Sequence, residues 1–269
     1  MESPVVLNWD VPRVPVGRWF AEGASWSVAH GGVFFDGVAT VVTDLVDGLS
    51  GILTFFPPLV LAALLAAGAY AARGWQFGLF TFAGFALIDG MRLWRPAMDS
   101  LSLVTASAVV ALVVAVPVGF VVRYAVVKRV VRPVLDAVPS VPVFVYLVPA
   151  AFLFGIGTAP GVVATAAVAL PAAVRLVESG LRDRPDPGEA NRIVVPALGM
   201  VVTAGLVGAG GLGGVVLTGL DRVSAATGFE GALAIVVLAV FLDRVTRVGA
   251  RPVEAAFAGN DERHGERAA

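Results

Sequence analysis

The stretch LSLVTASAVVALVVAVPVGFVV, from Leu101 to Val122, contains no charged side chain. A helix needs about 20 predominantly apolar residues to cross the roughly 30 Å hydrocarbon core of a bilayer. This stretch has that length and that composition. It therefore predicts a helix that crosses a membrane, and it makes lipid the first candidate for the solvent of this chain.

Further apolar runs lie on both sides of this stretch. The run from Ala137 to Val174 is also uncharged, and it is long enough for two spans divided by the turn-forming cluster Gly155 to Gly161. Shorter or interrupted runs complete the set. They are Gly48 to Ala72, which contains Pro57 and Pro58, Gly74 to Ile88, Ile193 to about Ala209, and Gly231 to Leu242. The sequence thus predicts an all-α membrane protein, a polytopic bundle of about seven transmembrane helices.

Composition supports this fold class and excludes several functions. Hydrophobic residues make up 58% of the chain and charged residues only 14%, which is too few charges to cover a water-facing surface. There is no cysteine, and the two histidines, His30 and His264, lie far apart near the two ends. No phosphate-binding G-x-x-x-x-G-K-[ST] sequence is present, and the net charge is −1. We therefore expect no catalytic site, no metal site, no cofactor and no nucleic-acid partner.

The distribution of basic residues predicts the orientation. With seven spans and an extracytoplasmic N-terminus, the cytoplasmic segments hold 14 of the 19 Lys and Arg residues. We therefore expect a multi-pass protein of the inner or plasma membrane with its N-terminus outside and its C-terminus in the cytoplasm. Residues 1–47 are expected to form an extracytoplasmic segment, either an amphipathic surface helix around Val16 to Val28 or a poorly ordered tail. Residues 48–248 are expected to form the transmembrane domain, and residues 249–269 a cytoplasmic polar tail.

One segment carries a family resemblance. From Arg132 to Arg182 the chain reads RPVLDAVPSVPVFVYLVPAAFLFGIGTAPGVVATAAVALPAAVRLVESGLR. Its P-x-x-D-x-x-x-x-x-P-x-F-V-Y-L-x-P run, its F-G-I-G and P-G-V elements and its A-L-P and R-L pair resemble the permease subunit of ABC importers for glycine betaine, proline and choline. A later glycine cluster, Gly210 to Gly213, matches the same family.

The resemblance implies the type I ABC importer fold and a set of residues with roles. The motif residues expected to be structural are Asp136, Pro142, Pro171, Arg175, Gly211 and Gly213. The residues expected to line the translocation path are Phe144, Tyr146, Pro149, Gly155 and Gly157. The resemblance also implies a homodimer in the lipid bilayer, a separate ABC ATPase subunit and an extracytoplasmic solute-binding protein. The implied function is osmoprotective uptake of glycine betaine, choline or proline-like compatible solutes.

The sequence departs from the family pattern in one cytoplasmic loop. Family members carry there an EAA motif, a following glycine and an Ile-x-Leu-Pro, which form the coupling helix that docks on the ATPase. This chain reads GLRDRPDPGEANRIVVPALGMVV, in which Arg182, Glu189, Ala190 and Asn191 would be the remnant. A few dozen residues of the family pattern are missing, and Pro185 to Gly188 favours a turn over a helix. Glu189 would otherwise be a solvated loop carboxylate.

Three explanations of the short loop stay open: a degenerate permease, a permease with a different ATPase contact, or an internal deletion. Two alternatives to an importer stay open as well. A non-transporting paralogue is favoured by the short loop. An ion-coupled secondary transporter is disfavoured because it would need ionisable residues within its spans, whereas Asp89, Asp136, Arg175, Glu178 and Asp243 all fall near predicted helix ends, where snorkelling is the ordinary explanation.

Overall fold

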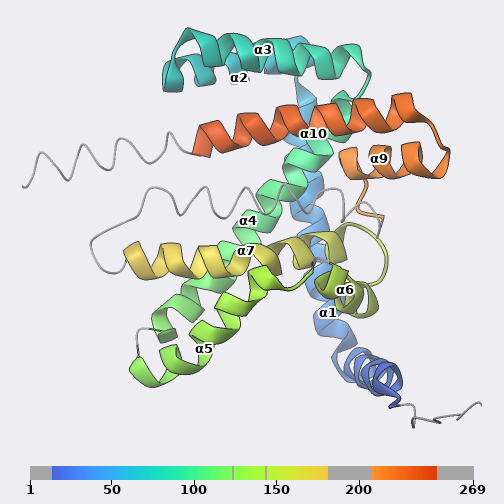
Figure 1. Cartoon of the computed structure of the whole chain (residues 1–269), viewed down its shortest axis with the longest axis vertical. Coiled ribbons are helices and arrows are strands. Elements are labelled where there is room, and N and C mark those ends of the chain that lie inside the picture. The colour runs from blue at the N-terminus through green and yellow to red at the C-terminus, as the bar shows by residue number, and fades with distance from the viewer. Residues whose placement is uncertain (1–13, 123, 143, 181–207, 247–269) are drawn as a thin grey trace, which may run out of the picture.

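The computed structural model describes residues 14–122, 124–142, 144–180 and 208–246, and within these ranges it contains helices and no strand. The helices, in chain order, are α1 Val16–Phe55, α2 Pro58–Arg73, α3 Trp75–Gly90, α4 Trp94–Val122, α5 Ala125–Ala137, the short 3₁₀ helix η1 Val138–Ser140, α6 Phe144–Phe154, α7 Thr158–Gly180, α9 Gly211–Asp221 and α10 Ala225–Thr246. Figure 1 shows their arrangement.

Four of these helices, α1, α4, α7 and α10, are long and apolar enough to cross a membrane. A fifth span results if the bent pair Arg129–Ser140 and Val145–Phe154, whose axes differ by 103°, is counted as one. Helices α2 and α9 are apolar but shorter. The predicted all-α membrane fold is thereby confirmed, while the count of about seven spans stays a prediction.

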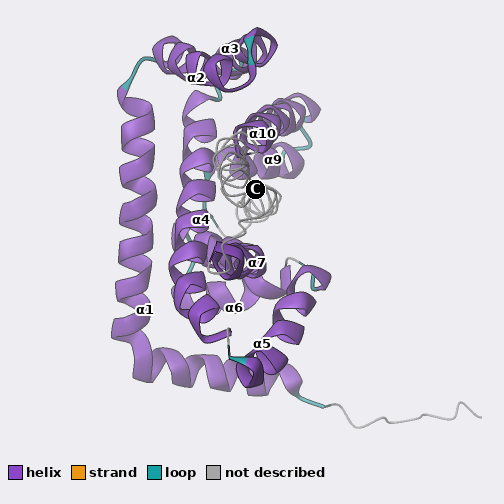
Figure 2. Cartoon of the chain, turned by 90° about the vertical axis from the view of Figure 1, so that its left-hand side faces the viewer, coloured by secondary structure: helices purple, strands orange, loops and turns teal. Residues whose placement is uncertain are grey.

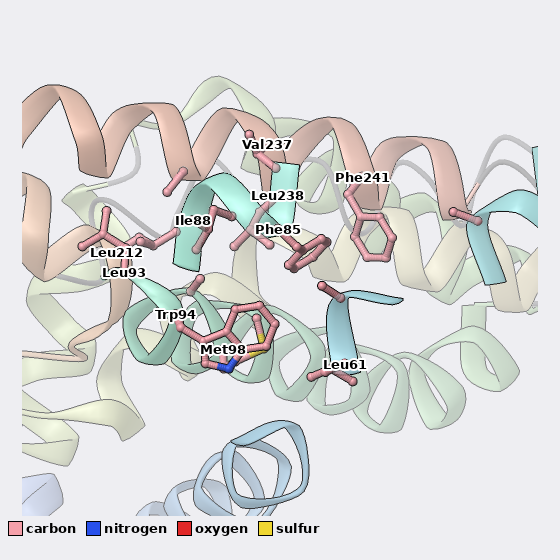
Figure 3. Packing of buried hydrophobic residues seen from close by; sticks show 14 of the residues in the cluster. Leu61, Phe85, Ile88, Leu93, Trp94, Met98, Leu212, Val237, Leu238 and Phe241 are labelled. Atoms are coloured by element: carbon pink, nitrogen blue, oxygen red, sulfur yellow. The ribbon is translucent and has the colours of Figure 1, made fainter. Parts of the chain in front are cut away.

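Helix α4 lies at the centre of the bundle. Its first half packs against α3, α9 and α10 in an apolar core that also takes in α2 (Figure 3). Aromatic rings fill this core, because the ring centroid of Phe85 lies 5.2 Å from that of Phe241 and 6.1 Å from that of Trp94. Both pairs meet edge to face, the arrangement that ring quadrupoles prefer.

The second half of α4 packs against α7, which is joined to α5 and α6. Here the buried residues are mainly small. They are Ala111, Ala115, Leu135, Ala166, Ala169, Ala173 and Val174. Small side chains let helix backbones approach closely, which is the usual way that helices associate in lipid, where apolar burial alone gives little driving force.

Helix α1 lies beside α4 and is far less buried (Figure 2). Figures 1 and 2 show it running crosswise to α2, α3, α7 and α10, with one bend along its length. Of its 40 residues only Ala24, Val42 and Val46 are buried. It packs against α4, α6 and α7 along one side and is otherwise open.

The predicted single span from Gly48 to Ala72 is wrong. The structure divides this stretch, since α1 continues without interruption through residue 47 to Phe55 and α2 starts at Pro58. The cause is the proline pair. Pro57 is extended, with φ −53° and ψ 142°, and the residue before a proline is pushed out of the helical region, so the chain turns here and Pro58 begins a new helix.

Candidate functional site

Two residues that the sequence analysis selected separately meet in the structure. The guanidinium Nη2 of Arg175, on α7, lies 2.6 Å from Oδ1 of Asp136, on α5. The side chains are 39% and 54% exposed. The pair joins the bent α5–α6 unit to α7 near the end of α7 that leads into the short loop.

A motif proline lies close in sequence to each residue of this pair. Pro142 is exposed between η1 and α6, where the chain bends, and Pro171 is buried inside α7. A proline inside a helix removes one backbone hydrogen bond and favours a kink. Pro171 therefore favours a kink in α7 one turn before Arg175.

The residues predicted to line the path share one element and the turn after it. Phe144, Tyr146 and Pro149 lie on α6, and Gly155 and Gly157 lie in the turn before α7 with φ of 79° and 141°. The Tyr146 hydroxyl donates a hydrogen bond of 2.8 Å to the backbone carbonyl of Val138. This bond ties α6 back to η1, so Tyr146 has a structural task. That these residues line a path stays a prediction.

The glycine cluster of the family motif docks the start of α9 on α4. The hydroxyl of Ser100 accepts a 2.7 Å hydrogen bond from the backbone N–H of Leu212. Gly211 has φ 63°, and a Cβ added to it would lie 2.5 Å from the Ser100 hydroxyl oxygen. Only glycine therefore fits at position 211, and Gly213, two residues on, is buried.

Ser100 is unusual among the buried hydroxyls of α4. Ser102 and Ser107 donate to carbonyls of their own helix four residues back, Met98 and Leu103, each at 2.7 to 2.8 Å. That local bond is the common way to satisfy a hydroxyl inside an apolar bundle. Ser100 instead receives a bond from another helix, so this contact fixes where α9 begins.

A polar cavity of about 430 Å³ lies beside this contact. We name it the Asp99 cavity. Its charged and hydroxyl-bearing lining residues are Asp47, Ser50 and Thr54 of α1, Arg95 and Asp99 of α4, and Thr158 of α7. The backbone of Gly210 and Gly211 completes the wall.

Within the Asp99 cavity one hydrogen bond crosses between helices. The Ser50 hydroxyl donates to Oδ1 of Asp99 at 2.5 Å, and Asp99 is half-buried. Asp47 and Arg95 are exposed to the cavity, and neither side chain has a hydrogen bond or an ion pair with the described part of the chain.

Sequence reasoning missed this cavity. Asp99 lies two residues before the uncharged stretch that begins at Leu101, and the sequence analysis assigns it no role. Asp47 and Arg95 enter that analysis only in the assignment of sides of the membrane. The signal available was their shared side, because Asp47, Arg95, Thr158 and Gly210 all fall in segments or at span ends that the distribution of basic residues predicts to be extracytoplasmic.

The predicted ATPase-coupling residues Arg182, Glu189, Ala190 and Asn191 lie outside the described residues. Among the residues that the structure does describe, no group of three or more His, Cys, Asp or Glu side chains is placed to hold a metal ion. The candidate site is therefore built from the Asp99 cavity, the α6 residues and the Asp136–Arg175 pair.

Comparison with known proteins identifies close relatives. The glycine betaine transport system permease protein OpuAB of Bacillus subtilis is 34% identical over 88% of this chain and 95% of its own length. The glycine betaine/proline betaine transport system permease protein ProW of Escherichia coli is 33% identical over 88% of this chain and 76% of its own length. The glycine betaine/carnitine transport permease protein GbuB of Listeria monocytogenes is 31% identical, over 88% and 96%. No family model matches the sequence.

The same alignments measure a deficit in this chain. The match to OpuAB runs over 267 positions, whereas 88% of 269 residues is about 237, so about 30 positions of that relative have no counterpart here. The match to GbuB runs over 272 positions with the same 88% of this chain, which gives a deficit of about 35. A deficit of this size agrees with the few dozen residues that the sequence pattern lacks near Glu189.

Proposed function

Because this chain belongs to the family of glycine betaine ABC transport permeases, we propose that it forms the translocation path of an ATP-driven importer for glycine betaine, choline or proline-like solutes. The observation that carries the proposal is the 34% identity with OpuAB across 95% of that protein. The all-helical bundle with several spans of membrane-crossing length supports it. Uptake of such solutes serves osmoprotection.

The proposal assigns ATP hydrolysis to a separate subunit. No phosphate-binding loop sequence occurs in the 269 residues, so the energy must come from a partner ATPase. An extracytoplasmic binding protein would deliver the solute, and two copies of this chain would enclose the path. Residues 48–248 would form the permease domain, with residues 1–47 outside the cytoplasm and residues 249–269 inside it.

The path itself is proposed to run past α6. Phe144, Tyr146 and Pro149 lie along one element, and the turn at Gly155 and Gly157 connects that element to α7, whose first residue, Thr158, lines the Asp99 cavity. Non-helical backbone between two spans is tolerated where it lines a cavity or packs against protein, and Thr158, directly after this turn, lines the Asp99 cavity.

A second function has a specific observation in its favour. The deficit of about 30 residues relative to OpuAB agrees with the loss of most of the coupling helix. A coupling helix must present a turn or more of rigid surface to the ATPase. A chain without it keeps the family fold as a non-transporting paralogue. Glu189, Ala190 and Asn191, with Arg182 before them, are the remnant that would have to suffice for coupling.

Co-purification with an ATPase separates the two functions. The chain is expressed with the nucleotide-binding subunit encoded beside it, extracted in mild detergent and passed over a sizing column. An importer predicts one complex whose ATP hydrolysis rises when a binding protein and glycine betaine are added. Glu189→Lys should abolish the complex, while Asp186→Lys in the same loop should leave it intact, because only Glu189 matches the motif.

A loop graft serves as the matched control. In it, the residues between Arg182 and Ile193 are replaced by a segment that carries the complete EAA motif of the family. If the graft binds the ATPase and the native chain does not, the fold is competent and the coupling helix is what the chain has lost. That outcome would establish the non-transporting paralogue.

A further inference from the structure

Helix α1 forms one wall of the Asp99 cavity. Its length and composition would let it cross a membrane. It runs crosswise to α2, α3, α7 and α10, whereas it lies beside the central span α4 (Figures 1 and 2).

The sides of α1 carry different residues. On a helical projection at 100° per residue, Phe34, Val41 and Ile52 share one side, and they are 67%, 68% and 66% exposed. The polar residues share another side; they include Glu22, Asp36, Asp47, Ser50 and Thr54. The buried residues Ala24, Val42 and Val46 lie between these sides. One side of α1 is therefore apolar, one is polar and one is packed against the bundle.

The Asp99 cavity lies on the polar side of α1, where water is available. Asp47, Ser50 and Thr54 all line it. The remaining walls come from the first turns of α4 and α7 and from Gly210 and Gly211 at the start of α9. The basic-residue distribution places each of these segments on the extracytoplasmic side. Four separate parts of the chain thus converge on one polar cavity at one surface.

The cavity is lined by charges of both signs, and these charges do not form an ion pair with one another. Arg95 and Asp47 have no bonded partner in the described ranges, and Asp99 accepts one hydrogen bond from a neutral hydroxyl. A guanidinium binds a carboxylate through two parallel hydrogen bonds. A quaternary ammonium offers no hydrogen-bond donor, so it is recognised by nearby negative charge or by aromatic faces. The charged lining of the cavity supplies the first of these.

We propose that the Asp99 cavity is an acceptor site in the permease for a zwitterion with a quaternary ammonium and a carboxylate, held by Arg95 at the carboxylate and by Asp47 and Asp99 at the cation. The inference rests on the proposed function for the class of solute, and it adds a site within this chain. A volume of about 430 Å³ falls in the range of about 300 to 1,000 Å³ that small-molecule sites occupy. Ser50 holds the Asp99 carboxylate in place.

The test is equilibrium binding to the purified full chain without ATPase or nucleotide. The chain is placed in lipid discs of phosphatidylethanolamine and phosphatidylglycerol, whose headgroups carry no trimethylammonium group. The probes are radiolabelled glycine betaine, a zwitterion, and radiolabelled choline, which carries the cation without a carboxylate. The two probes separate the role of the arginine from that of the aspartates.

Each variant has its own signature. Arg95→Gln should weaken glycine betaine binding about tenfold or more and leave choline within about twofold, because only the carboxylate contact is lost. Asp99→Asn and Asp47→Asn should weaken both probes. Arg92→Gln and Asp44→Asn are the matched controls, since Arg92 lies in the turn before α4, Asp44 lies one turn before Asp47 on α1, and neither lines the cavity.

Every outcome decides the proposal. The proposal is supported if Arg95→Gln weakens the binding of glycine betaine but not of choline, while the control variants bind both probes as the native chain does. Equal loss of both probes in Arg95→Gln, equal effects of the control variants, or no binding of either probe by the native chain at millimolar concentration overturns it. Because no ATPase is present, a failure to co-purify an ATPase leaves this result unaffected, so the two proposals fail separately.

Discussion

The charged side chains near the two ends of α7 are arranged differently. Near its last turns, Arg175 is closed on Asp136 at 2.6 Å. At its first residue, Thr158, it borders the Asp99 cavity, where Arg95 and Asp47 remain apart from one another. A rise of about 1.5 Å per residue separates Thr158 from Arg175 by roughly 25 Å along the helix.

The difference shows which end is organised for a solute and which for packing. Opposite charges in an ion pair neutralise each other and attract a ligand only weakly. Charges that stay separate around a cavity can each attract the opposite charge of a ligand. The closed pair lies next to the loop expected to contact the ATPase, and the open cavity lies on the side expected to face the binding protein. The variants below change one end at a time.

The largest effect is expected where α9 docks beside the cavity. Gly211→Val places a branched side chain at φ 63° and against the Ser100 hydroxyl, 2.5 Å from the new Cβ. Left-handed backbone and overpacking together should cost on the order of 3 kcal/mol of stability. The midpoint of thermal unfolding in detergent measures this loss of stability. Because Gly211 also lines the Asp99 cavity, Gly211→Val should lose solute binding as well.

Gly214→Val is the control for this change. Gly214 lies three residues later on α9, and a Cβ added there meets nothing within 4 Å. A side chain in a helix interior is favoured over glycine, so this variant should keep or slightly raise the unfolding midpoint. Equal destabilisation at both positions would mean that α9 does not dock as described.

Much of the bundle follows from the sequence, because uncharged runs and turn residues are local signals. The stretch Leu101 to Val122 is found within α4, and the break expected at Gly155 separates α6 from α7. The resemblance also selected Asp136 and Arg175, although not their contact. A contact across 39 residues depends on how α5 turns back on α7, and no local pattern encodes that.

The long α1 was not predicted, for a related reason. Its pattern mixes three faces, so polar residues such as Asp36, Asp44 and Asp47 recur among the apolar ones and make it resemble an irregular segment. The Asp99 cavity was missed because its residues come from four distant segments. In the sequence each of these segments resembles the ordinary end of a span, and only the fold brings the four together.

An intermediate effect is expected from Tyr146→Phe, near the closed end. The change removes the 2.8 Å hydrogen bond from the tyrosine hydroxyl to the Val138 carbonyl, which ties α6 to η1. Loss of one such bond should cost about 1 kcal/mol, again read as the unfolding midpoint. Binding of glycine betaine at the Asp99 cavity should not change. Altered solute binding with unaltered stability would instead favour the predicted place of Tyr146 in the path.

The smallest effect is expected from the closed pair itself. Asp136 and Arg175 are both more than one third exposed, so Asp136→Ala or Arg175→Ala should lower stability by only about 0.5 kcal/mol, and less at high salt. The double exchange Asp136→Arg with Arg175→Asp should recover part of that loss, since the opposite charges again face each other. If each single variant instead disrupts the complex with the ATPase while stability is kept, the pair serves the subunit contact, and the closed end of α7 is organised for a partner as the open end is for a solute.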